Sequence, residues 1–139
     1  MKTGWLIAAV LYIAVSLTAR EHESDKVLKE SYRFRGDGKT KTLMSANYNG
    51  DIKVAGHGGQ TVDVVIQKKI WARSAEQFEL ARKEVTLDIM EEEDLIEFFV
   101  DGPFREKNRG NHWHAKRYRV VYHFDVKVPF QTGVELETI

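Results

Sequence analysis

The chain of 139 residues contains no cysteine and only 2 prolines. The lack of cysteine excludes a disulfide framework, a thiolate metal site, a cysteine nucleophile and a lipid anchor on an N-terminal cysteine. No sign of charge is in excess, because 21 basic residues balance 21 acidic ones. Net charge therefore gives no argument for a nucleic-acid or other polyanionic partner. The 42% hydrophobic and 30% charged residues that are present are typical of one packed domain rather than a disordered chain.

The N-terminus has the pattern of a secretory signal peptide. Lys2 supplies a positive charge, an apolar run follows from Trp5 to Val15, and small residues then lead up to Ala19. This order predicts a signal helix in residues 1–19, with cleavage after Ala19 or after Ser16. The alternative is an uncleaved membrane anchor, but the apolar run is several residues short of the roughly 20 that span a bilayer. We expect export to the periplasm or cell surface of a bacterium, where a stable domain without disulfides is common.

Beyond the leader, residues 20–29 are charged and without a pattern, which predicts a flexible lead-in. Residues 30–139 are predicted to form a β-rich domain, because apolar and polar residues alternate along most of them. Asn49–Gly50 and Gly56–Gly59 are turn signals between these segments. The expected strands centre on Tyr32–Phe34, Thr40–Ala46, Ile52–Val54, Val62–Ile70, Val85–Ile89, Leu95–Val100, Tyr118–Val128 and Val134–Leu136.

The clearest strand signal runs from Tyr118 to Val128. Its apolar side chains point one way, whereas Arg119, His123 and the other charged side chains point the other way. One apolar and one polar face predict a mainly β fold built as an antiparallel sheet or sandwich. One short helix interrupts the strands, since Ser74 and Gln77 have the spacing of a capping box and apolar residues follow at helical spacing. We expect that helix from about Ala75 to Lys83.

Several segments together carry a family resemblance. They are Asn49–Gly50–Asp51–Ile52–Lys53–Val54–Ala55–Gly56, the strand Val62–Ile70 with the helix and strand pair Val85–Val100, and Val126–Lys127–Val128–Pro129 followed by Gly133–Val134–Glu135–Leu136. In this order, over residues from about 30 to the end, the chain resembles the N-terminal portion of the bacterial DUF4097 family of adhesins, or β-strand-repeat proteins.

The resemblance implies a β-roll or β-helix built from repeated Asn-Gly-x-Ile-x-Val-x-Gly units, a role in adhesion, and no catalytic residues. The sequence stops at Thr138–Ile139, in the middle of a strand pattern. We therefore expect either that the chain is truncated at its C-terminus or that its last edge is completed by another molecule.

The loop Asp101–Lys116 contains the candidate metal ligands His112 and His114, which flank Trp113. Two imidazoles on one face can begin a zinc site, and His123 follows nearby, but no third ligand has a recognisable spacing. The alternative is a polar loop with Trp113 folded back over the sheet.

The segment from Arg105 to Arg119 is also rich in basic residues, with one glutamate among them. Basic and aromatic residues together favour contact with anionic polymers or lipid head groups, whereas export argues against nucleic acid. The alternative is a solvated loop that balances the acidic residues Glu91–Asp94. The candidate polyanion contacts are Arg105, Lys107, Arg109, Lys116, Arg117 and Arg119.

The sequence gives no catalytic constellation. Of the serines beyond the leader, none lies in a Gly-x-Ser-x-Gly motif, and Ser74 is explained as a helix cap. We therefore expect no enzyme activity and no cofactor. The interpretation is an exported, non-enzymatic envelope protein that acts by surface contact or scaffolding on an envelope polymer or a surface protein. It would touch the membrane only through an uncleaved leader. The alternative is a small-ligand or metal-binding module on the loop of residues 101–118.

Overall fold

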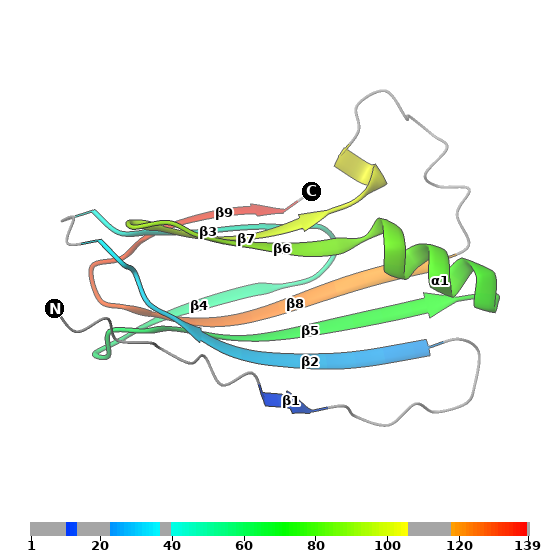
Figure 1. Cartoon of the computed structure of the whole chain (residues 1–139), viewed down its shortest axis with the longest axis horizontal. Coiled ribbons are helices and arrows are strands. Elements are labelled where there is room, and N and C mark those ends of the chain that lie inside the picture. Colours follow the sequence, from blue (N-terminus) through cyan, green and yellow to red (C-terminus); the bar gives the residue numbers. More distant parts are fainter. Residues whose placement is uncertain (1–10, 14–22, 37–39, 106–117, 139) are drawn as a thin grey trace, which may run out of the picture.

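The computed structural model describes residues 11–13, 23–36, 40–105 and 118–138, and this part of the chain is mainly β. It contains nine strands, one α-helix and one short 3₁₀ helix (Figure 1). In chain order the elements are β1 (Leu11–Ile13), β2 (Glu23–Tyr32), β3 (Thr42–Asn47), β4 (Ile52–His57), β5 (Val62–Ala72), α1 (Ala75–Glu84), β6 (Thr86–Glu91), β7 (Leu95–Asp101), η1 (Pro103–Arg105), β8 (Tyr118–Pro129) and β9 (Gly133–Thr138).

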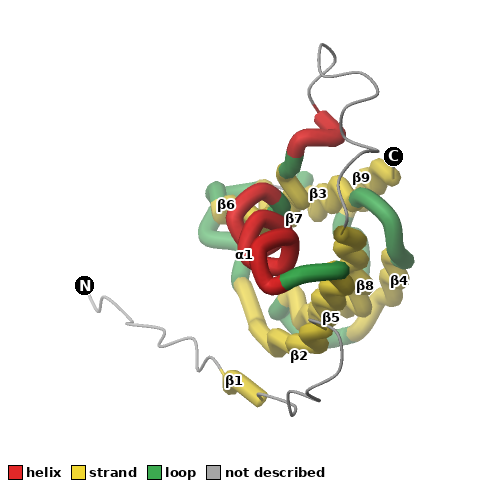
Figure 2. The backbone as a smooth tube through the Cα atoms, turned by 90° about the vertical axis from the view of Figure 1, so that its right-hand side faces the viewer, coloured by secondary structure: helices red, strands yellow, loops and turns green. Residues whose placement is uncertain are grey.

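The strands form two sheets that face one another (Figures 1 and 2). One sheet has the order β1-β2-β5-β8-β4 and the other has the order β6-β7-β3-β9. The expectation of antiparallel pairing is correct only in part. β3 runs parallel to both β7 and β9, and β4 runs parallel to β8. Parallel pairs arise because the chain changes sheet between β3 and β4 and again between β8 and β9, so these consecutive strands are not neighbours within one sheet.

The core lies between the two sheets and is centred on β5 and β8. The predicted alternation in β8 is confirmed, since Val120, Phe124 and Val126 are buried whereas Arg119 and Asp125 are exposed. Rings from opposite sheets meet in this layer, because Phe98 of β7 stacks on Phe124 with 6.1 Å between centroids. Such interdigitation of apolar side chains from two inner faces is what holds a β-sandwich together.

Residues 23–29 do not form the flexible lead-in that the sequence predicts, because they begin strand β2. β2 pairs antiparallel with β5 over its whole length, from Glu23 opposite Trp71 to Tyr32 opposite Val62. Polar side chains also bridge the two strands, and the Trp71 indole donates to Glu23 Oε1 at 2.6 Å. The alternation is hidden in the sequence because charged residues occupy both faces at the start of β2. Pairing with the long strand β5 stabilises β2 as a strand.

Helix α1 confirms the predicted cap. The Ser74 hydroxyl accepts a hydrogen bond from the Gln77 backbone N–H at 3.2 Å, and the helix runs to Glu84, one residue further than expected. Ala81 is fully buried and Phe78 packs against the core. Helix α1 lies at one end of the sandwich, near the gap between the sheets (Figure 2). It therefore covers part of the core that the strands leave open.

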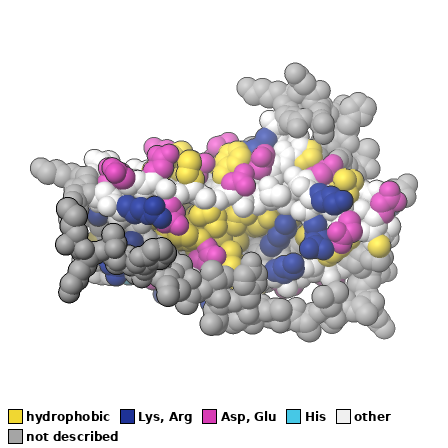
Figure 3. Space-filling view, in the orientation of Figure 1, with side chains coloured by type: hydrophobic (Ala, Val, Ile, Leu, Met, Phe, Trp, Pro, Cys, Tyr) yellow, Lys and Arg dark blue, Asp and Glu magenta, His cyan; other side chains and the backbone are white. Residues whose placement is uncertain are grey.

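The gap between β2 and β6 remains only half covered along the rest of this side. Leu28 of β2 and Leu87 and Ile89 of β6 are half-buried. Figure 3 shows hydrophobic side chains along the middle of this side. Burial and the nearby Glu91 carboxylate raise the pKa of Glu30. The sheets thus form an open sandwich and not a closed barrel.

The predicted leader lies almost entirely outside the described residues. Only Leu11–Ile13 are described, and they form a short strand β1 on the edge of β2 rather than part of a helix. Within the described part of the chain, no helix has the length and apolarity needed to cross a membrane. The signal peptide itself stays a prediction.

Candidate contact surfaces

Most of the predicted site residues lie outside the described part of the chain. These are His112 and His114, the candidate metal ligands, and four candidate polyanion contacts, Lys107, Arg109, Lys116 and Arg117. His123 is described, and its Nδ1 accepts a hydrogen bond from the Asp51 backbone N–H at 3.3 Å. The described residues hold no group of three or more metal-ligating side chains. The metal site and most of the basic cluster therefore stay predictions.

The two described members of that cluster lie on opposite sides of the molecule. Arg105 follows β7, where its guanidinium stacks 4.1 Å above the Phe99 ring and its Nε donates to the Val100 carbonyl at 2.6 Å. Its Nη1 lies 3.9 Å from Glu137 Oε1, and the side chain is 14% exposed. Arg119 instead lies exposed on the other sheet, 5.5 Å from the Trp71 ring. Arg105 is thus engaged within the fold, whereas Arg119 is exposed and forms no ion pair with a described residue.

Strand β9 is the most exposed of the strands whose side chains are described, and all six of its residues are exposed. Its apolar residues nevertheless face the core layer. Val134 pairs with Leu43 and Leu136 pairs with Ser45, and both partners on β3 are fully buried. Val134 and Leu136 remain 40% and 49% exposed. Residues that face the core yet stay exposed indicate a core that is incomplete at this edge.

Strand β4 is the corresponding edge of the other sheet. It pairs with β8 on one side, and no strand of the described residues pairs with its other side. Ile52 and Val54 face the core layer and are half-buried. β4 and β9 lie on the same side of the sandwich (Figure 2). We call this the open side, defined by Ile52, Val54, Val134 and Leu136.

A side-chain hydrogen bond links the two sheets next to the open side. Buried Asn47 donates from Nδ2 to the Tyr122 carbonyl at 2.9 Å and accepts the Tyr48 N–H at 2.8 Å. The predicted turn at Asn49–Gly50 is confirmed, with positive φ angles of 54° and 137°. Because Asn47 belongs to one sheet and Tyr122 to the other, its amide holds β3 in register above β8.

The two edge strands of the open side carry opposite charges on their outward faces. On β9 the charged residues that face outward are Glu135 and Glu137, whereas the charged residue that faces outward on β4 is Lys53. Free strand edges expose unpaired N–H and C=O groups that pair readily with another extended segment. The open side is therefore suited to the addition of a strand in which apolar and charged residues alternate. Beside β9 those charged residues would be basic.

One half-buried amine was missed by the sequence reasoning. Lys68 sits on the inward face of β5, where its Nζ donates to the Val85 carbonyl at 3.0 Å and lies 5.3 Å from the Tyr122 ring. Burial lowers the pKa of Lys68 to about 8, and the positive charges of Lys26 and Arg82 add to this effect. Burial likewise raises the pKa of Tyr122, and the Asp88 carboxylate adds to that shift. In the sequence, the only sign of this burial is that Lys68 lies on the same face of β5 as the apolar residues.

Compared with known proteins, the chain matches no family model, no curated protein and no solved structure. The geometry of the two edges, and not a relative, therefore carries the functional argument.

Proposed function

We propose that the protein is an exported, non-enzymatic envelope protein, similar to DUF4097 adhesins, that acts by surface contact. The single observation that carries this proposal is strand β9, whose core-facing Val134 and Leu136 are 40% and 49% exposed. An exposed edge with apolar residues is a template for strand addition. The predicted leader and the resemblance support export and an adhesive role.

The partner is an extended segment of a surface protein that adds to β9. Apolar residues of that segment would cover Val134 and Leu136, and its alternate residues would lie beside Glu135 and Glu137. Opposite charges across neighbouring strands stabilise the pair by about 0.2–1 kcal/mol each, and like charges oppose it. Lys or Arg at those alternate positions therefore defines the partner strand.

Synthetic peptides test this partner directly. A peptide of alternating valine and lysine is titrated into the purified protein, and a peptide with glutamate in place of lysine serves as its charge-reversed control. We expect only the lysine peptide to bind and to protect the β9 amides from hydrogen exchange. The variant Leu136→Lys should abolish this binding, because an inward-pointing charge blocks strand addition. Val65→Lys is the matched control, since Val65 is also exposed (37%) but lies on a central strand.

Binding to intact bacterial cells and to envelope surface proteins extends the test to natural partners. Uniform absence of binding, or equal binding of both peptides and both variants, would contradict the proposal. The alternative function, a metal or small-ligand module on residues 101–118, rests on residues that are mostly not described. No observation on the described ones favours it.

A further inference from the structure

A second surface lies at the end of the sandwich away from helix α1. Described residues of three connections meet there: those that flank residues 37–39 between β2 and β3, the turn between β4 and β5, and the turn between β8 and β9 (Figure 1). They line a depression of about 490 Å³, a volume within the usual range of small-ligand sites. We call this the turn-end pocket. Its described lining consists of Arg33, Phe34, Lys41, His57–Gln60 and Pro129–Gln131.

The charge of the turn-end pocket is unbalanced. Among its described lining residues none is acidic, whereas Arg33 and Lys41 both carry a positive charge. Neither cation forms an ion pair with any described residue. Lys41 Nζ lies 5.8 Å from the Phe34 ring centroid, which keeps the ammonium over an aromatic face. Two cations without an ion-pair partner among the described residues, one of them over an aromatic ring, are suited to an anion.

Phe130 gives the pocket an exposed aromatic wall. Its side chain is 67% exposed, more than any other large hydrophobic residue of the described part. It nevertheless has a fixed place, because its backbone N–H donates to the His57 carbonyl at 3.0 Å. The ring also rests against Gly56, where an added Cβ would come within 2.9 Å of it. A held but exposed ring offers a flat apolar surface at low entropic cost.

His57 holds the opposite wall in place. The Gly59 backbone N–H donates to His57 Nδ1 at 3.1 Å, so Nδ1 is an acceptor. The proton is therefore on Nε2, which donates to the Thr61 carbonyl at 2.6 Å. Both ring nitrogens are thus used within the turn, and the turn keeps its shape without a ligand. A preformed wall of this kind reduces the cost of binding.

We propose that the turn-end pocket binds an acidic sugar unit of an anionic polysaccharide. The Arg33 guanidinium and the Lys41 ammonium take the sugar carboxylate, and the Phe130 ring packs against the sugar ring. The side-chain amides of Gln60 and Gln131 supply donors and acceptors for the hydroxyl groups. This site is separate from the open side and needs no strand addition at β9.

Calorimetric titration tests the proposal with three probes. They are a galacturonate oligosaccharide, neutral maltohexaose and inorganic polyphosphate. We expect the acidic oligosaccharide to bind and the neutral one not to bind. Polyphosphate should bind more weakly because it has no ring to pack on Phe130.

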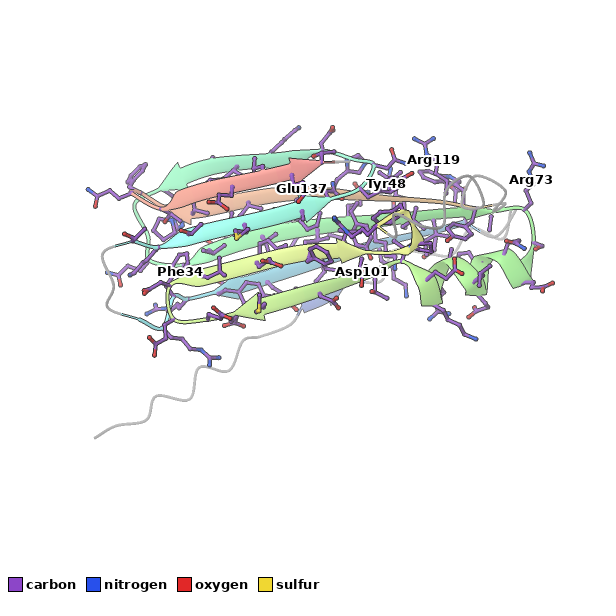
Figure 4. All side chains as sticks on the ribbon, turned by 90° about the horizontal axis from the view of Figure 1, so that it is seen from above. Phe34, Tyr48, Arg73, Asp101, Arg119 and Glu137 are labelled. Atoms are coloured by element: carbon purple, nitrogen blue, oxygen red, sulfur yellow. The ribbon has the colours of Figure 1, made fainter. Side chains whose placement is uncertain are left out.

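Matched variants locate the binding. The double variant Arg33→Gln, Lys41→Gln should weaken galacturonate binding by about tenfold or more, because two charge-assisted contacts are lost. Phe130→Ala should weaken it several-fold without changing the fold. The control Arg73→Gln, Lys83→Gln removes the same charge from exposed residues. Arg73 lies at the end opposite Phe34 (Figure 4).

Each outcome bears on the proposal. Loss of binding in the pocket variants, with binding kept in the control and in Leu136→Lys, supports it. Equal loss in the control would mean diffuse charge attraction and would overturn it. Absence of galacturonate binding, or equal binding of maltohexaose or polyphosphate, would overturn it as well. Because Leu136→Lys affects only the open side, failure here is distinguishable from failure of strand addition.

Discussion

Replacing Gly50 with alanine should destabilise the protein strongly. Gly50 has φ of 137°, a region that residues with a Cβ rarely adopt, and an added Cβ would overlap the backbone oxygen of Tyr122. The backbone strain costs about 1–3 kcal/mol. Moving Tyr122 away would also break its hydrogen bond from the Asn47 amide. A buried carbonyl left without a donor costs about another 1–3 kcal/mol.

The sum, about 4 kcal/mol, is a large share of the roughly 5–15 kcal/mol by which a domain is stable. Urea unfolding followed by circular dichroism measures it, with an expected midpoint decrease of about 2 M. Gly58→Ala is the matched control, since its nearest neighbour would be a Phe130 ring carbon at 3.9 Å and its φ is not positive. A loss below about 1 kcal/mol for Gly50→Ala, or equal effects of both changes, would refute the reasoning.

Three further predictions concern the half-buried amine of Lys68, the helix cap and the metal site. Between pH 8 and 10.5 the unfolded chain keeps a proton on Lys68 that the folded chain has lost, so this group makes stability rise with pH. Lys68→Met should therefore stabilise the protein at pH 7 by about 1 kcal/mol, after allowance for solvent screening. That gain should be smaller at pH 9.5, because the folded wild-type chain has then lost the proton on Lys68. A gain that does not change with pH would contradict this explanation. An equal gain from Lys69→Met, the control on the outward face, would contradict it as well. Ser74→Ala should cost about 1 kcal/mol in urea unfolding because the helix loses its cap, and an unchanged midpoint would contradict the cap. Zinc should raise the melting temperature only if His112 and His114 bind it; no shift, or a shift kept in the double alanine variant, would remove the metal hypothesis.

The parts of the fold that the sequence predicts well depend on local signals. The alternation of β8 and the capping box of α1 each involve residues within a few positions of one another. The pair Asn49–Gly50 likewise predicts a turn with positive φ angles, which both residues adopt. In each case the pattern of one short segment determines the structure of that segment. The alternation at Val134–Leu136 also predicted a strand, and β9 confirms it.

The parts that could not be predicted depend on neighbours distant in the sequence. β2 has charged residues on both faces, and only its pairing with β5 makes it a strand. Parallel pairing of β3 with β9 follows from where the chain changes sheet, which no single segment reveals. Lys68 interrupts an apolar face, and its burial depends on Val85 and Tyr122.

The candidate site residues show the same division. The sequence predicted a strand from Val134 to Leu136, but it gave no sign that this strand and β4 form two edges on the same side of the sandwich. The turn-end pocket was also missed, because its cations and its exposed ring come from segments that are far apart in the chain. Each of them alone reads as an ordinary solvated residue.

The pairing of β3 has a consequence for how the polypeptide acquires its shape. One neighbour of β3 begins at Leu95 and the other at Gly133, so closing the second contact spans about 90 residues and makes folding slow. Both pairings of β3 therefore become possible only after residues 133–138 have been synthesised. Until then one edge of β3 lacks the strand that covers it in the folded protein, and an extended segment of another molecule can pair with it there.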